Sequence, residues 1–279
     1  MDVLHEKNER LKQILLGCSS IAVAFSGGVD SAFLLQTAHG VLGGNVLAIT
    51  AAPVFVPQRE LEEAKAFCRD RGIPHIIIPA EGLNINAIRH NPPDRCYHCK
   101  KMIFGKIREV AAGNGIQCIA EGSNMDDTGD YRPGMKAIRE LSVISPLLEA
   151  GLSKADIRTL SKELGLPTWN KASFACLASR FVYGEAITDE KLSAVDQAEQ
   201  LLMDLGFRQF RVRIHGTLAR IELLPEDIDR AAERETREYL SAKLRQFGFS
   251  YVTLDLAGYR TGSMNEMLAR AREPGNGSA

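Results

Sequence analysis

The sequence of 279 residues has no long apolar run and no excess of charge of either sign. No stretch approaches the roughly 18 apolar residues that a membrane-spanning helix requires. With 34 Lys and Arg residues against 35 Asp and Glu residues, the net charge is −1, so the chain has no overall attraction for nucleic acid or an anionic membrane. The first ten residues are typical of a charged helix rather than a signal peptide. We therefore expect a cytoplasmic protein with no membrane and no nucleic-acid partner.

Cysteine is also sparse, with six residues in the chain. In a cytoplasmic protein these residues are expected to be thiols, metal ligands or catalysts rather than structural disulfides. Cys18, Cys68 and Cys118 lie beside apolar neighbours and are predicted to be buried core thiols. The remaining three are of a different kind: Cys96 and Cys99 form a Cys-x-x-Cys pair at the start of a predicted helix, and Cys176 lies in a long connection.

A Cys-x-x-Cys pair is compatible with a redox dithiol, half of a zinc site, part of an iron–sulfur site, or a purely structural pair. Zinc usually takes four ligands, and Cys96, Cys99, Cys176 and His98 are the candidates. Three thiolates suit a [4Fe–4S] cluster that leaves one iron without a protein ligand, and this iron could hold an additional sulfide. The residues alone leave these interpretations open.

Apolar strand-like runs alternate with helical patterns through the first 170 residues, which predicts an α/β fold with a doubly wound parallel sheet. The predicted strands lie near 20–25, 45–51, 74–79, 116–121 and 142–147, and the predicted helices near 30–42, 57–71, 98–112 and 153–164.

After about residue 180 the pattern changes to that of a small C-terminal α+β domain. Thr188 is a candidate N-cap, and we expect strands at 210–214, 220–223 and 251–256 and a helix at 226–246. The predicted domains are therefore 1–180 and 181–271, followed by a disordered tail at 272–279. We find no internal repeat and no low-complexity segment.

The most informative segment is Ser-Gly-Gly-Val-Asp-Ser at residues 26–31, between a predicted buried strand and a predicted helix. Gly27 and Gly28 allow a phosphate to approach the backbone, and a helix N-terminus attracts anions. Ser26 and Ser31 add hydroxyl donors. The carboxylate of Asp30 repels phosphate unless a cation lies between them, which indicates magnesium-bound polyphosphate.

An alternative for these six residues is an ordinary strand-to-helix turn with Asp30 or Ser31 as the helix cap. The segment lacks the Gly-Lys-Ser/Thr ending of a Walker P-loop. In a doubly wound sheet the ligand binds at the carboxyl ends of the strands. Thr50 and Gly122 follow two other strands at that edge and are predicted to contribute to the nucleotide site.

The hexapeptide resembles the PP-loop of the ATP pyrophosphatases, with all five fixed positions matched. Over nearly the whole chain the sequence resembles the LarE family of ATP-dependent sulfur transferases. The matching segments are Ser26–Ser31, Asp130–Gly134, Trp169–Lys171, Ser179–Phe181 with Tyr183 and Gly184, Arg211–Arg213, Ala219–Leu223 and Tyr251–Leu256.

This resemblance implies a function in the synthesis of the nickel-pincer cofactor of lactate racemase. The implied enzyme uses ATP and Mg²⁺ to adenylate a carboxylate of pyridinium-3,5-dicarboxylate mononucleotide, a small-molecule partner, and converts it to a thiocarboxylate. Asp30 would lie near the metal. The resemblance also implies a homo-oligomer, since relatives form hexamers.

The sulfur donor depends on the cysteines. In family members with one functional cysteine, the residue matching Cys176 gives up its own sulfur and becomes dehydroalanine. Similar three-cysteine members are thought to bind a [4Fe–4S] cluster and to transfer a cluster-bound sulfide. Because a sacrificial Cys176 would have no use for Cys96 and Cys99, we favour the cluster and keep sacrificial donation as the alternative.

The substrate-binding candidates are arginines and nearby carboxylates. Arg211 and Arg213 share one face of a strand by the two-residue period. The resemblance places them with Arg180 near the phosphate and carboxylate of the substrate, and it places Glu199 and Glu222 near the reactive cysteine. On sequence alone, a solvated strand face and surface carboxylates are the alternatives.

Weaker candidates remain in two other segments. Lys101, like its neighbour Lys100, could reach a phosphate, although a lysine pair on a helix is usually solvated. Asp126, Asp127 and Asp130 are further candidates for binding magnesium or substrate.

Three other functions are compatible with parts of the sequence. A tRNA thiolase would combine a PP-loop with cysteines, but the chain has no basic RNA-binding stretch. An amide-forming ligase of the NAD or GMP synthetase kind would not need the three cysteines, and no glutaminase domain is visible. A nucleotide sensor without enzymatic activity would release no pyrophosphate.

Overall fold

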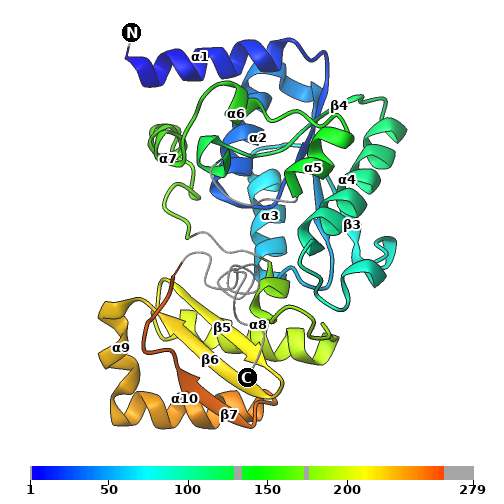
Figure 1. The fold of residues 1–279 in the computed structure, drawn as a ribbon. Helices are drawn as coiled ribbons and strands as arrows, with labels where there is room; N and C mark the ends of the chain where they lie inside the picture. Colours follow the sequence, from blue (N-terminus) through cyan, green and yellow to red (C-terminus); the bar gives the residue numbers. More distant parts are fainter. Residues whose placement is uncertain (1, 129–133, 173–175, 261–279) are drawn as a thin grey trace, which may run out of the picture. The chain divides into compact units, whose positions relative to one another are not determined.

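The computed structural model describes residues 2–128, 134–172 and 176–260. The chain forms two compact units (Figure 1). Unit 1 comprises Met1–Ile88 and Pro93–Phe174, and unit 2 comprises Arg89–Pro92 and Ala175–Ala279. The predicted Asp130–Pro133 motif and the predicted disordered tail lie outside the described residues.

Unit 1 is built on a parallel sheet, as predicted for an α/β doubly wound fold. Its four strands have the order β3-β2-β1-β4, and β1 pairs in parallel with both β2 and β4. The strands are β1 (Ile21–Ala24), β2 (Val46–Ala52), β3 (His75–Pro79) and β4 (Cys118–Ala120). The chain order reverses direction across β1, so the carboxyl end of β1 lies where such sheets bind ligands.

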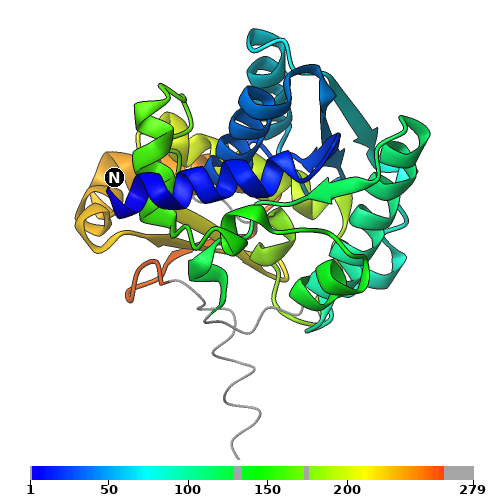
Figure 2. The ribbon, with the colours of Figure 1, turned by 90° about the horizontal axis from the view of Figure 1, so that it is seen from above.

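Helices cover both faces of this sheet, because alternate strand residues point to opposite sides (Figures 1 and 2). Ile21 and Val23 pack into a core with α1, α2, α3 and α7, whereas Ala22 and Ile49 pack into a second core with α4 and α5. The helices of unit 1 are α1 (Val3–Leu16), α2 (Val29–Leu42), α3 (Gln58–Asp70), α4 (Arg95–Gly113), α5 (Gly134–Glu140), α6 (Pro146–Glu149) and α7 (Lys154–Glu163).

The predicted fifth strand at 142–147 is wrong. Ile144 forms only an isolated parallel bridge with Ala120, although its backbone N–H donates to Ile119 O and its carbonyl accepts from Glu121 N. Ser142 has a φ of 52°, and Pro146 begins α6. The left-handed residue before the segment and the proline after it therefore leave room for one bridging residue.

Unit 2 is the predicted α+β part, with a mixed sheet of order β5-β6-β7. β5 and β6 are antiparallel, and β6 and β7 are parallel. Its elements are α8 (Asp189–Asp204), β5 (Phe210–His215), β6 (Leu218–Leu223), α9 (Pro225–Ala232), α10 (Arg234–Gln246) and β7 (Tyr251–Leu254).

The prediction of one helix at 226–246 is corrected to two. Glu233 has φ −53° and ψ 143°, an extended conformation that ends α9 and serves as the N-cap position of α10. Thr188 is the N-cap of α8 as predicted, and its hydroxyl accepts a hydrogen bond from Lys191 N.

The sequence predicts one domain boundary, at residues 180 and 181, whereas the compact units divide between Phe174 and Ala175 and also assign Arg89–Pro92 to unit 2. This short segment is tied to unit 2 by hydrogen bonds. Asn91 Nδ2 donates to the carbonyls of Phe181 and Val182 at 2.8 and 2.7 Å, and Ile187 N donates to Arg89 O at 2.7 Å.

Among the described residues no helix combines the length and apolar character needed to cross a membrane. The prediction of core thiols is confirmed for Cys68, which is 1% exposed, whereas Cys18 and Cys118 are half-buried against the same core. Burial raises the pKa of Cys68 and of Cys118 to about 12. These thiols are therefore poor nucleophiles and metal ligands at neutral pH.

Candidate functional site

The loop Ser26–Ser31 connects β1 to α2, as the sequence predicts. Gly27 has a φ of 75°, and Gly28 is the N-cap of α2. The two serine hydroxyls lie 3.1 Å apart, and Ser31 Oγ donates to Gly28 O at 3.2 Å. Because the first N–H groups of a helix have no carbonyl partner within it, the turn forms an anion-binding backbone at the carboxyl end of β1.

The two other strand-end candidates contact this loop. A methyl group on Gly122 would lie 3.1 Å from Ser31 N, so the segment after β4 packs closely against the first turn of α2. Thr50 lies in β2 and is 3% exposed. Its hydroxyl donates to Phe25 O at 2.7 Å and lies 2.8 Å from His75 Nε2. Thr50 therefore braces the residue that precedes the loop.

Asp30 is the carboxylate predicted to lie near magnesium. Its Oδ2 forms an ion pair with Lys154 Nζ, and its Oδ1 accepts a hydrogen bond from Asn124 Nδ2 at 3.3 Å. Its side chain is 22% exposed. A partly exposed carboxylate beside a phosphate-binding turn is a suitable oxygen ligand for Mg²⁺ bound to polyphosphate.

A second lysine fixes the backbone of the loop. Lys171 Nζ donates to Gly27 O at 3.2 Å and to Glu60 Oε2 at 2.6 Å, and it also bonds Glu63. Arg158 of α7 donates to the carbonyls of Trp169 and Lys171, both at 2.8 Å. The segment 169–171, part of the family resemblance, is thus attached on one side to α7 and on the other to the loop.

Asp126 and Asp127, the weaker metal candidates, accept hydrogen bonds from backbone N–H groups. Asp127 Oδ2 accepts from Asn124 N at 2.9 Å, and Asp126 Oδ2 accepts from Lys154 N at 3.2 Å. In this arrangement they support the two residues that bond Asp30. Asp130 lies outside the described residues.

The three candidate cluster ligands are divided between the units. Cys96 is exposed and Cys99 half-buried, both in the first turns of α4 in unit 1, whereas Cys176 is half-buried in unit 2. No three Cys, His, Asp or Glu side chains form a metal-binding group among residues 2–128, 134–172 and 176–260. The donor chemistry itself, three thiols outside any disulfide, fits an iron–sulfur cluster.

Lys101 belongs to unit 1 and not to the arginine network of unit 2 described below. Its ammonium group lies 3.0 Å from Tyr97 Oη and 3.1 Å from Glu140 Oε2. The hydrogen bonds to Tyr97 and Glu140 raise the pKa of Lys101. Its side chain is 52% exposed, so it remains available to an anion from solvent.

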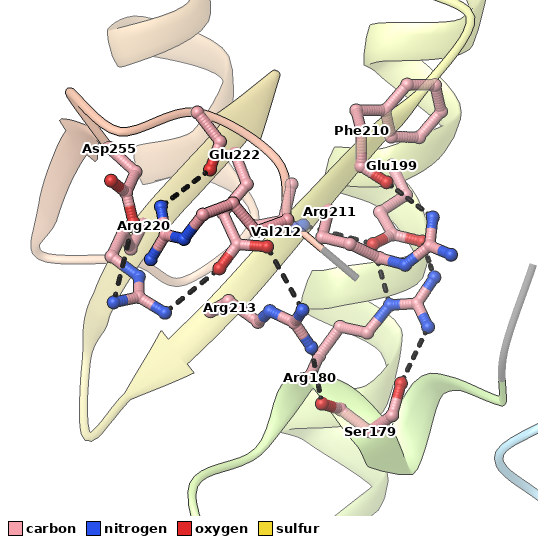
Figure 3. A network of polar contacts seen from close by, with 12 residues as sticks. Ser179, Arg180, Glu199, Phe210, Arg211, Val212, Arg213, Arg220, Glu222 and Asp255 are labelled. Carbon is pink, nitrogen blue, oxygen red and sulfur yellow. Dashed lines mark hydrogen bonds and ion pairs between the residues drawn. The ribbon is translucent and has the colours of Figure 1, made fainter. Parts of the chain in front are cut away.

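Unit 2 contains a buried network of arginines and carboxylates (Figure 3). Arg180 is 1% exposed and Glu199 is 0% exposed. Arg180 Nε and Nη2 bind the two carboxylate oxygens of Glu199 at 2.8 and 2.7 Å. Arg180 Nη1 donates to Cys176 O at 3.2 Å and to Ser179 Oγ at 2.8 Å. Arg180 thus joins Glu199 of α8 to the backbone of the candidate sulfur donor.

The second part of the network lies on β5 and β6. The register pairs Arg211 with Glu222 and Arg213 with Arg220, so these four side chains share one face of the sheet. Arg213 Nη2 and Arg220 Nη2 each donate to Glu222 at 3.0 Å, to different oxygens. Arg220 also lies 3.6 Å from Asp255. The predicted shared face of Arg211 and Arg213 is confirmed.

The interior of this network carries more positive than negative charge. Arg180, Arg211 and Arg213 are at most 5% exposed, and their buried counterions are the fully enclosed Glu199 and Glu222. Burial, followed by the repulsion of Arg180, lowers the pKa of Arg211 to about 10. Arg211 therefore remains charged at neutral pH, and an anion bound beside it would relieve the repulsion between the arginines.

The burial excludes the alternatives of a solvated strand face and surface carboxylates for these residues. Sequence reasoning missed Lys154 and Arg220, which bond two of the predicted site residues. A signal for Lys154 exists, because Ser153 and Asp156 form a capping box that marks residue 154 as the first of a helix. Arg220 alternates with Glu222 on a strand, and this spacing places both on one face.

The chain matches none of the protein-family models. It is 42% identical over 96% of its length to an uncharacterized protein of Synechocystis sp., which it covers completely. It is 38% identical over 98% of its length to the pyridinium-3,5-bisthiocarboxylic acid mononucleotide synthase of Lactiplantibacillus plantarum, of which it covers 98%.

A more distant relationship covers part of the chain. A glutamine-hydrolyzing GMP synthase of Methanocaldococcus jannaschii is 27% identical over 59% of this chain, which covers 56% of that protein. This relationship is consistent with the PP-loop fold of unit 1. The near full-length similarity to the bisthiocarboxylic acid synthase is more specific, and it shows that the chain belongs to the LarE family.

Proposed function

We propose that the chain is an ATP-dependent sulfur transferase that converts a carboxylate of pyridinium-3,5-dicarboxylate mononucleotide to a thiocarboxylate. The observation that carries this proposal is the loop Ser26–Ser31 with Asp30 at the start of α2, within a chain 38% identical to a synthase of the bisthiocarboxylic acid product. The loop supplies the ATP site, and the family supplies the class of acceptor.

ATP would bind with its phosphates on the backbone of the loop and with Mg²⁺ near Asp30. A substrate carboxylate oxygen attacks the α-phosphorus, the bond to the β-phosphate breaks, and pyrophosphate leaves. The product is an acyl-adenylate and thus has AMP as a good leaving group. The loop contributes positioning and neutralisation of charge to this step, with no covalent bond to the protein.

The arginine network of unit 2 is suited to bind the acceptor. Its substrate must carry carboxylates and a phosphate, and the interior of the network has three arginines against two glutamates. Arg180 uses Nε and Nη2 on Glu199 and Nη1 on Cys176 O and Ser179 Oγ, so its role here is to position the Cys176 backbone. Arg211 and Arg213 are the better candidates for contact with the substrate.

A sulfur nucleophile must then attack the acyl carbon and release AMP, which leaves a thiocarboxylate. We propose that the sulfur comes from a [4Fe–4S] cluster held by Cys96, Cys99 and Cys176, which would supply a sulfide when bound. Two crossings of the chain between the units lie close to these residues in sequence: Pro92 precedes Cys96, and Ala175 precedes Cys176. A cluster on all three thiolates would join the two units.

The test is anaerobic purification, followed by iron and sulfide analysis and by assays of pyrophosphate and thiocarboxylate formation. We expect iron and sulfide in the unmodified protein and their loss in Cys96→Ala. Asp30→Ala should abolish pyrophosphate release. An iron-free protein that converts substrate once and loses about 34 Da at Cys176, the mass of hydrogen sulfide, would establish sacrificial donation instead. Absence of pyrophosphate release with the dicarboxylate would overturn the proposed function.

A further inference from the structure

The loop Ser26–Ser31 itself contains one acidic residue and no basic residue. Bound polyphosphate therefore needs cationic groups from other elements. Lys154 Nζ is bonded to Asp30 Oδ2, within this loop, although α7 begins 124 positions further along the chain. The lysine and the aspartate side chains are 27% and 22% exposed, so the ion pair lies at the surface of the phosphate-binding turn.

The backbone of Lys154 is held firmly, whereas its side chain has one strong partner. Lys154 is the first residue of α7, whose N-cap Ser153 forms a capping box with Asp156. Asp126 accepts a hydrogen bond from Lys154 N, and Lys7 bonds Asp156 at 2.8 Å. A four-carbon side chain on a fixed backbone can move its ammonium group by several ångströms through rotamer changes.

The two lysines that contact the loop differ in their counterions. Lys171 bonds two carboxylates, Glu60 and Glu63, as well as Gly27 O. Lys154 bonds Asp30, the carboxylate that the proposed function assigns to magnesium. When a divalent cation occupies Asp30, the like charges of the metal and the ammonium group disfavour the ion pair, and the nearest new anion is the polyphosphate.

We propose that Lys154 is a ligand of the β- and γ-phosphates of ATP and of pyrophosphate, and that its ion pair with Asp30 is the form it adopts without nucleotide. Binding of Mg·ATP exchanges partners: Asp30 moves from Lys154 to the metal, and Lys154 moves to a phosphate oxygen. No covalent bond changes in this exchange. The inference rests on the proposed function, because it requires that the loop binds ATP.

The first experiment measures binding and not catalysis. Isothermal titration of the full chain with Mg·pyrophosphate should show at least about tenfold weaker binding for Lys154→Met, equivalent to about 1.4 kcal/mol. AMP, which lacks these phosphates, should bind Lys154→Met as it binds the unmodified protein. Lys154→Arg, which keeps the charge, should lose about threefold or less. Lys106→Met removes a similarly exposed lysine, paired with Glu109 at 2.6 Å, and should bind pyrophosphate normally.

The second experiment separates a phosphate ligand from a lysine that only neutralises Asp30. Metal-free pyrophosphate is titrated into Asp30→Asn and into Asp30→Asn/Lys154→Met. A phosphate ligand predicts a similar loss, about tenfold, on removal of the lysine in this background. If the loss disappears when Asp30 is neutral, or if Lys154→Met binds Mg·pyrophosphate as tightly as the unmodified protein, the inference is wrong while the ATP site stands. If the unmodified protein binds neither ATP nor pyrophosphate, the proposed function is wrong as well.

Discussion

Arg180 and Glu199 are both enclosed in unit 2, and the carboxylate satisfies two guanidinium nitrogens and Val212 N. Removing one member leaves a buried charge without its counterion. We predict that Glu199→Ala lowers the free energy of unfolding by about 3–5 kcal/mol, measured by urea denaturation. Replacing both residues by methionine should cost less than Glu199→Ala alone, because no unpaired charge then remains.

A matched control for this prediction is Asp204→Ala. Asp204 is an exposed carboxylate on the same helix, bonded to Gln200, and its removal should change the free energy of unfolding by about 0.5 kcal/mol or less. A loss of similar size in Asp204→Ala and Glu199→Ala would contradict the role assigned to the buried pair.

His75 gives a prediction about pH. Burial, followed by the charge of Lys65, lowers its pKa from the ordinary value of 6.5. The unfolded chain therefore binds more protons than the folded chain below pH 6.5, so stability is complete above that value and is lost as the pH falls below it. His75→Gln should reduce the slope of the unfolding free energy against pH between about 6.5 and 5. An unchanged slope would show that His75 does not titrate as inferred.

Residue roles were predictable where they depend on short spacing. The alternation of Arg211 and Arg213 gave their common face, and the glycines of residues 26–31 gave the turn. The burial of Glu199 was not predictable, because its partner Arg180 is distant in sequence and packing brings the two together. The bond between Lys154 and Asp30 likewise depends on tertiary structure.

At the level of single elements, α8 offers a direct test of a sequence-predicted cap. Thr188 Oγ1 accepts from Lys191 N at 3.3 Å. Thr188→Ala should lower the free energy of unfolding by about 1 kcal/mol, since one N–H of the first turn loses its partner. Thermal or urea unfolding would measure this loss. Ser193→Ala, a change within the same helix, should have a smaller effect, and equal effects would exclude a capping contribution.

Element types followed from hydrophobic period, and element ends did not. The run at 142–147 is apolar enough for a strand, yet Ser142 and Pro146 restrict it to one bridge. The pattern at 226–246 is continuous in helical period, yet Glu233 is extended. In both places a local backbone conformation, set by a few residues, overrides the signal that averages over the whole segment.

At the level of the whole molecule, the proposal assigns one ligand to each unit. Mg·pyrophosphate should slow amide hydrogen exchange chiefly in unit 1, around the loop Ser26–Ser31 and the first turn of α7. The dicarboxylate mononucleotide should slow exchange chiefly in β5 and β6 of unit 2. Exchange followed by mass spectrometry of peptides measures both effects. Protection of unit 2 by pyrophosphate alone would contradict this assignment.

The segment Arg89–Pro92 has a consequence for how the protein can be divided. The chain enters unit 2 for these four residues and returns to unit 1 before Cys96, so neither unit is a continuous stretch of the gene. A fragment that begins at residue 175 would lack Asn91, which is fully buried and bonds the carbonyls of Phe181 and Val182. The two units are therefore not interchangeable cassettes, and a chimaera that replaces either unit must exchange both of its segments.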